Sequence, residues 1–239
     1  MNVAPTADAI DDFLVEVETL RGDDPAAALA KLERAPAELA RRPESRLLAA
    51  DLTWELNGAK MARPLLTTLV KEVPDYADAR HLLGAVLEEL GDERGKVEQF
   101  LEVLRLDEGL DEALEEGDAD DLEDLIVEAA EQTISGLPER FRQKLADVPI
   151  LVESRPSEDL VREGFDPRAF GLFEGPTHAE HQNSEASEVP TRIVLYSANL
   201  LAESLDEDQL REEVETTVLH EAGHYFGLDE DDLARLGLD

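Results

Sequence analysis

The eleven residues from His220 to Glu230, HEAGHYFGLDE, constrain the fold of this chain more than any other segment. They place two histidines four residues apart, and residues at that spacing lie on the same face of an α-helix. A helix would therefore direct the imidazoles of His220 and His224 at one point, where a divalent metal ion can bind. The preceding residues 210–219, LREEVETTVL, carry apolar side chains at helical spacing. We therefore expect one amphipathic helix that continues through the motif.

The motif has the form HExxH, with Glu221 directly after the first histidine. In metallopeptidases of this type, the two histidines bind zinc and the glutamate is the general base. The chain contains no cysteine, so a metal must be held by histidines and carboxylates. The alternative is that the histidines are ordinary buried or surface polar residues. HExxH followed by glycine at the eighth position seldom arises by chance, which favours the metal site.

A third ligand must come from outside the helix, because a catalytic zinc site has three protein ligands and one open position. Gly227 allows the chain to turn sharply, so that Glu230, the eleventh motif residue, can return to the metal. A turn that differs by one residue would bring Asp229 or Asp231 there instead, and all three carboxylates remain candidates. No glutamate follows Glu230, which excludes a third ligand supplied as glutamate by a later helix.

Five short segments of the C-terminal half form a series with the motif. They are LPERFR (137–142), VPILVE (148–153), GLFEG (171–175), PTRIVLY (190–196) and VLHEAGHYFGLDEDDL (218–233). This series resembles the small bacterial zincin-like metallopeptidase family. The resemblance implies a zinc-dependent hydrolase in which His220, His224 and an acidic residue bind zinc and Glu221 is the general base. Phe173 stands where many members have tyrosine, which leaves the substrate contacts open.

The N-terminal half carries a period of 34 residues. The period aligns Ala28 with Ala62 and Lys96, Leu32 with Leu66 and Phe100, and Ala35 with Leu69 and Val103. Thirty-four residues is the length of a tetratricopeptide repeat, and Asn57-Gly58 and Gly91 fall where such repeats turn between helices. The segment from Ala9 to Leu106 therefore resembles about three degenerate repeats. An unrelated helical bundle is the alternative.

These patterns predict two domains, an all-α tetratricopeptide-like repeat domain over residues 1–115 and an α+β minimal zincin-like domain over residues 116–239. Residues 107–131 are acidic, contain no lysine or arginine, and mark the boundary. In the second domain, residues 148–154 and 191–197 are rich in β-branched residues and suit a small sheet. The polar segment 174–189 is expected to be a loop that carries His178 and His181 at the surface.

Aspartate and glutamate number 58 against 22 lysines and arginines, which gives a formal net charge of −36. This charge repels nucleic acid and anionic membrane surfaces, so neither is expected as a partner. Basic peptides would be attracted, although solubility or adaptation to a salty cytoplasm explains the same charge. The N-terminus does not resemble a signal peptide, and no apolar run approaches about 18 residues, which indicates a cytoplasmic protein.

The leading hypothesis is a zinc peptidase that acts on a peptide or protein substrate and whose repeats bind a protein partner. Tyr196, Tyr225 and His178 are the candidates for stabilising the oxyanion. The second hypothesis is an interaction or scaffold protein in which the zinc site is structural or inactive. Glu221 argues against the second, because a site kept only for its metal has no need of the base.

Overall fold

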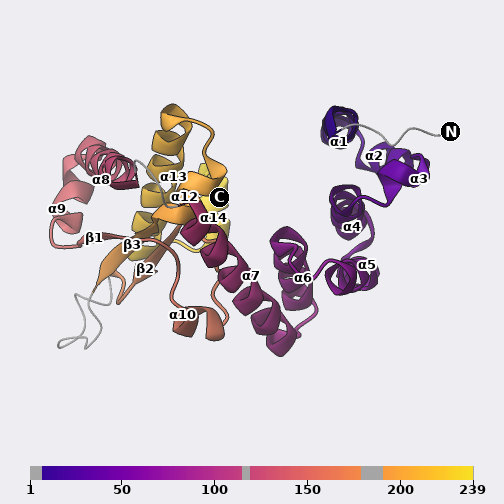
Figure 1. The fold of residues 1–239 in the computed structure, drawn as a ribbon. Helices are drawn as coiled ribbons and strands as arrows, with labels where there is room; N and C mark the ends of the chain where they lie inside the picture. The colour runs from indigo at the N-terminus through magenta and orange to yellow at the C-terminus, as the bar shows by residue number, and fades with distance from the viewer. Residues whose placement is uncertain (1–6, 115–118, 179–190, 239) are drawn as a thin grey trace. The chain divides into compact units, whose positions relative to one another are not determined.

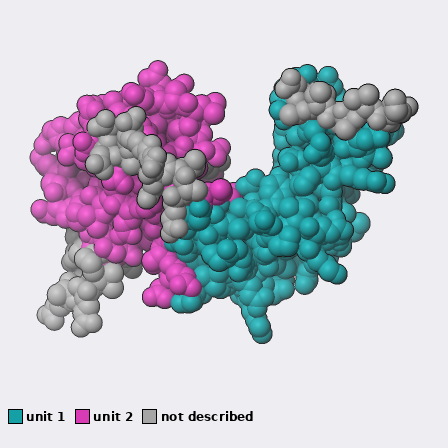
Figure 2. All heavy atoms as spheres, in the orientation of Figure 1, with its two compact units in different colours: residues 1–109, 161–164 teal, residues 110–160, 165–239 magenta. Residues whose placement is uncertain are grey.

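The computed structural model describes residues 7–114, 119–178 and 191–238 (Figure 1). The chain divides into two compact units (Figure 2). The first unit contains residues 1–109 and 161–164, and the second contains residues 110–160 and 165–239. Each unit buries its own clusters of apolar side chains. No helix in the described part of the chain is long and apolar enough to cross a membrane.

The first unit is a succession of helices. They are α1 (Ala7–Asp23), α2 (Pro25–Glu33), α3 (Ala37–Ala40), α4 (Pro43–Asn57), α5 (Ala59–Glu72), α6 (Ala77–Glu89) and α7 (Glu93–Leu114), the last of which extends past residue 109. Helices α2, α5 and α7 begin at residues 25, 59 and 93, and α4 and α6 begin at 43 and 77. The 34-residue period of the sequence is therefore also the period of the helices. Helix α2 packs on α1 and α4, and α5 packs on α4 and α6.

Several side chains at the positions that the 34-residue period aligns are buried in the core of this unit. Leu66 and Val103 are fully buried, and Phe100 is 3% exposed. Lys96 is also buried, and its ammonium lies 2.8 Å from carboxylate oxygens of both Glu88 and Glu93. A lysine can replace a small residue there because two carboxylates compensate its charge.

Helices α6 and α7 approach each other closely at Gly84. A Cβ atom built on Gly84 would lie 2.3 Å from Cε1 of Phe100, far inside van der Waals contact. The ring of Phe100 is enclosed, so it has little room to move away. The absence of a side chain at Gly84 therefore sets the distance between the two helices.

We predict that Gly84→Ala lowers the free energy of unfolding by about 1–3 kcal/mol, because the added methyl overpacks against Phe100. Gly109→Ala is the matched control, since Gly109 also lies within a helix but has nothing within 4 Å of its Cβ position. The control should raise stability by about 0.5–1 kcal/mol through helix propensity. Urea unfolding of both variants checks this, and equal stabilisation by the two substitutions would contradict the close packing.

The second unit is built around a three-stranded sheet with the order β1-β3-β2. Strand β1 (Ile150–Glu153) is parallel to β3 (Arg192–Tyr196), and β2 (Gly171–Glu174) is antiparallel to β3. The two β-rich segments of the sequence thus form β1 and β3, while β2 comes from a segment too short to show alternation. The remaining helices are α8 (Ala119–Gly136), α9 (Glu139–Leu145), α10 (Glu158–Arg162), α12 (Ser197–Glu203), α13 (Glu207–Tyr225) and α14 (Glu230–Leu236). The last two residues of α10 belong to the first unit.

Helix α13 is the central element of this unit. It packs against α8, β2, β3 and α12, and it buries Val214 and Val218 in the same cluster as Ile193 and Leu195 of β3. Its first turn is capped by Asp206, whose side chain accepts a hydrogen bond from the amide of Gln209. The helix is therefore fixed at its start and along its apolar face, which leaves its other face to carry polar groups.

The start of the second unit is tied to its interior by Arg155. The guanidinium of this residue donates to both carboxylate oxygens of Asp111, one at 2.5 Å and the other at 2.9 Å, and to the side-chain oxygen of Asn199. The amide of Asn199 in turn donates to the carbonyls of Pro167 and Ala169. This network holds the segment that leads into β2.

Candidate metal centre

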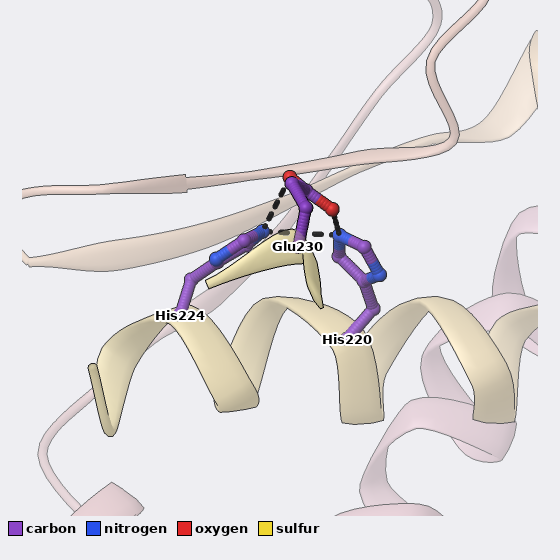
Figure 3. A group of neighbouring side chains, drawn as sticks. All are labelled: His220, His224 and Glu230. Atoms are coloured by element: carbon purple, nitrogen blue, oxygen red, sulfur yellow. Dashed lines mark hydrogen bonds and ion pairs between the residues drawn. The ribbon is translucent and has the colours of Figure 1, made fainter. Parts of the chain in front are cut away.

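Helix α13 carries His220, Glu221 and His224, as the sequence predicts. The four-residue spacing brings the Nε2 atoms of the two histidines to 3.0 Å from each other. The carboxylate of Glu230 points at the same place, 3.3 Å from Nε2 of His224 and 3.7 Å from Nε2 of His220. Figure 3 shows the three side chains converging from two helices. Their potential ligand atoms all lie within 4.8 Å of one another.

A sharp turn after α13 brings Glu230 back to the histidines. Gly227 has φ = +86°, a left-handed conformation that glycine adopts without strain. The amide of Leu228 donates to the carbonyl of Gly223, and the amide of Gly227 donates to that of His224, which closes the helix in a Schellman motif. Asp229 then caps α14 by accepting a hydrogen bond from the amide of Asp232, which makes Glu230 the first residue of α14.

Helix α14 is held against α13 by an apolar contact. Leu233 is fully buried, and a Cβ built on Gly223 would lie 2.4 Å from its Cδ2 atom. Helix α14 ends in a second Schellman motif at Gly237, where φ is +72°. This motif places the carbonyl oxygen of Leu238 at 2.5 Å from Nδ1 of His220. Both ends of α14 therefore contact the histidine pair.

The hydrogen bonds of the two histidines define their tautomers. Nδ1 of His220 contacts the carbonyl of Leu238, and Nδ1 of His224 lies 3.2 Å from the carbonyl of Leu228. Because a carbonyl only accepts, each Nδ1 must carry a proton, and in the neutral imidazole this leaves the Nε2 atom with a free lone pair. Two such nitrogens and a carboxylate facing one another repel unless a cation lies among them.

This set of donors fits zinc. Two imidazoles and one carboxylate are a known catalytic set, and zinc-to-nitrogen bonds of about 2.0–2.1 Å in tetrahedral geometry place ligand atoms roughly 3.3 Å apart. The separations in this protein run from 3.0 Å to 3.7 Å. Nδ1–H bonds to carbonyls are also the usual way in which a metal-binding histidine is oriented.

Glu221 lies beside this group and is 7% exposed. Burial raises the pKa of its carboxyl group above the ordinary value, while His220, His224 and a backbone hydrogen bond from Phe173 of β2 lower it. The strand comes this close because of Gly171, where a Cβ would lie 2.7 Å from Thr217 and 3.1 Å from Cγ of Glu221. A carboxylate held firmly at this place suits a general base.

The metal centre opens into a cleft of about 800 Å³ between the polar face of α13 and strand β2. His220, Glu221, His224 and Glu230 all line it. Gly171, Phe173 and Thr217 line it as well. Of these, the sequence indicated only Phe173, which stands where many members of the resembled family have tyrosine. The glycine that opens GLFEG is the one signal that could have indicated a close approach there.

The proposed oxyanion residues lie elsewhere. Tyr196 and Tyr225 are both buried, and neither lines the cleft in the described part of the chain. The hydroxyl of Tyr225 donates to the carbonyl of Lys144 at 3.1 Å and lies 3.1 Å from Nδ1 of His178. His178 packs on the rings of Tyr225 and Phe226. His181 lies outside the described residues.

The three carboxylates after Gly227 have separate positions. Glu230 approaches both histidines, whereas the side chain of Asp229 is occupied in capping α14. Asp231 is exposed and does not belong to the group that could hold a metal. The structure thus brings together His220, His224, Glu221 and Glu230.

Comparison with known families points to the same region. Residues 145–238 match the family model of the zincin-like metallopeptidases. The matched segment contains the sheet, the cleft and the metal centre. A comparison with curated proteins gave no match. The tetratricopeptide resemblance lies outside the matched segment and stays a prediction.

We predict that Glu230→Ala weakens zinc binding by more than the roughly 10- to 100-fold that loss of an outer-shell partner costs, because it removes a direct ligand. Asp231→Ala is the control, since it removes the adjacent exposed carboxylate from the same helical turn. Competition with a chromophoric chelator measures both affinities. Loss of zinc in Asp231→Ala or Asp229→Ala, with binding kept in Glu230→Ala, would contradict the assignment.

We also predict that Gly237→Ala weakens zinc binding about tenfold, because strain in the last turn of α14 displaces the carbonyl that orients His220. Gly91→Ala is a matched control: Gly91 has the same φ of +72°, nothing within 4 Å of its Cβ position, and a Schellman motif of its own. Both variants should lose about 1 kcal/mol of stability. Equal zinc affinity in the two variants would show that the Leu238 carbonyl does not position His220.

Proposed function

We propose that this protein is a zinc-dependent peptidase that hydrolyses amide bonds in peptide or protein substrates. The observation that carries the proposal is that His220, His224 and Glu230 converge in the same cleft that Glu221 lines. A site for structural zinc is normally closed by four protein ligands, whereas three ligands at an open cleft leave a position for reaction. The match of residues 145–238 to the zincin-like metallopeptidases supports the same activity.

The residues have distinct roles in this proposal. His220, His224 and Glu230 hold the zinc ion, which when bound lowers the pKa of a water molecule and polarises the substrate carbonyl. Glu221 accepts the proton of the attacking water and passes it to the leaving amine. Its hydrogen bond from Phe173 holds the carboxylate in place, as a general base requires.

Strand β2 offers a place for the substrate main chain. Among the described strands it pairs with β3 alone, which makes it an edge strand of the described sheet. That edge belongs to the strand whose residues Gly171 and Phe173 line the cleft. An extended peptide could pair with this edge by main-chain hydrogen bonds and so pass over Glu221.

The first unit has a different role in the proposal. Its helices recur every 34 residues, and stacked helical pairs form extended surfaces that bind other proteins. We therefore propose a protein-binding repeat domain over residues 1–115 joined to a peptidase domain over residues 116–239. The alternative of a scaffold with an inactive zinc site gives no role to Glu221, which is buried beside the histidines.

We predict that Glu221→Gln keeps zinc but loses hydrolysis by about 10²- to 10⁴-fold, because it removes the base and leaves every ligand in place. Zinc content is measured by native mass spectrometry, and hydrolysis is measured by chromatography of a peptide pool. The zinc-depleted wild-type protein is the control for background cleavage. Undiminished hydrolysis in Glu221→Gln would contradict the proposed mechanism.

A further inference from the structure

Glu213 lies on the same face of α13 as the catalytic groups. Glu213, Thr217 and Glu221 follow one another at four-residue spacing, which aligns their side chains along the helix. Eight residues of α-helix separate Glu213 from Glu221, a distance of about 12 Å along the axis. All three residues line the same cleft. The cleft therefore extends from the metal centre to a second carboxylate two turns away.

The carboxylate of Glu213 belongs to a half-buried residue and has no partner among the described residues. Across the described ranges of the chain, no hydrogen bond or ion pair involves its side chain, although its main-chain carbonyl accepts a hydrogen bond from Thr217. A charge that is partly removed from water without a counter-ion is costly. It also interacts more strongly with an incoming cation than a fully exposed carboxylate does, because less water screens it.

The remaining charges of the cleft are acidic. Besides Glu213, the lining includes Glu221, Asp229 and Glu230, and no lysine or arginine lines the cleft in the described part of the chain. The charge of a zinc ion would be balanced by Glu221 and Glu230. The side chain of Asp229 already accepts a hydrogen bond from the main-chain amide of Asp232. Glu213 is therefore the carboxylate that remains for a substrate.

The cleft walls suit a long basic side chain. Phe165, Phe170 and Phe173 line the same cleft. Lysine and arginine bury their aliphatic stems along such surfaces while the charged head reaches a polar partner. The net charge of −36 also raises the concentration of basic peptides near the protein.

We propose that Glu213 selects substrates that carry a lysine or arginine three to four residues from the scissile bond. The spacing follows because an extended peptide advances about 3.3 Å per residue, so 12 Å corresponds to three to four residues. The proposal rests on the proposed peptidase function, and it names basic peptides as the substrate class. Glu213 is a specificity residue here and takes no part in proton transfer.

Binding is tested apart from cleavage with the zinc-loaded Glu221→Gln protein. The probes are fluorescent nine-residue glycine–alanine peptides that carry one arginine at successive positions, and the same peptides with glutamine in its place. Fluorescence anisotropy should show that the arginine peptide binds about tenfold more tightly at the favoured position, as expected for a charged hydrogen bond. Adding Glu213→Gln should remove the difference.

Glu212→Gln is the matched control, because Glu212 is an exposed acid on the same helix and does not line the cleft. It removes the same charge and should leave the preference for arginine intact. Equal binding of arginine and glutamine peptides, including no detectable binding of either, overturns the inference. A preference for arginine that Glu213→Gln leaves unchanged, or that Glu212→Gln removes equally, overturns it as well.

Cleavage by the wild-type protein distinguishes this inference from the proposed function. Digestion of an unbiased peptide pool, followed by sequencing of the products by mass spectrometry, should show basic residues enriched at one position. Cleavage without that enrichment refutes the role of Glu213 and leaves the peptidase function standing. Absence of any cleavage beyond that of Glu221→Gln refutes the peptidase function, and the specificity proposal with it.

Discussion

The contact between Leu233 and Gly223 is the interaction on which the rest of the metal centre depends. Burial of a leucine side chain stabilises a fold by about 1.5–3 kcal/mol, and here the contact fixes α14 against α13. Once α14 is docked, its first residue places Glu230 beside the histidines and its last turn places the Leu238 carbonyl on His220. Apolar packing thus holds together three acceptor atoms that repel one another without a metal.

A second close approach defines the opposite wall of the cleft. Gly171 lets β2 lie against Thr217 and Glu221, so the strand proposed to pair with a substrate is also the strand whose Phe173 amide bonds the Glu221 carboxylate. One strand therefore both bonds the Glu221 carboxylate and lines the cleft.

The sequence predicts those parts of the structure that depend on local periodicity. The spacing of His220 and His224 requires one helical face, and Gly227 allows the turn that returns Glu230 to that face. The 34-residue period predicts where helices begin in the first unit. Each residue of an α-helix adds the same rise and the same rotation, so the spacing of residues in the sequence is enough to predict these features.

The features that the sequence did not reveal depend on contacts between distant elements. Nothing local shows that the carbonyl of Leu238 meets His220, or that Gly171 lies against Thr217. Tyr225 was one of the candidates for stabilising the oxyanion. One residue corresponds to about 100° of helical rotation, so its side chain faces the core, where its hydroxyl bonds the carbonyl of Lys144.

The most direct test of the metal centre is a crystal structure of the zinc-loaded protein with anomalous scattering measured at the zinc absorption edge. We expect one strong peak per chain within about 2.0–2.2 Å of Nε2 of His220, Nε2 of His224 and a carboxylate oxygen of Glu230. A peak held by Asp229 or Asp231 in place of Glu230, or no peak at the histidine pair, would contradict the structure proposed for this site.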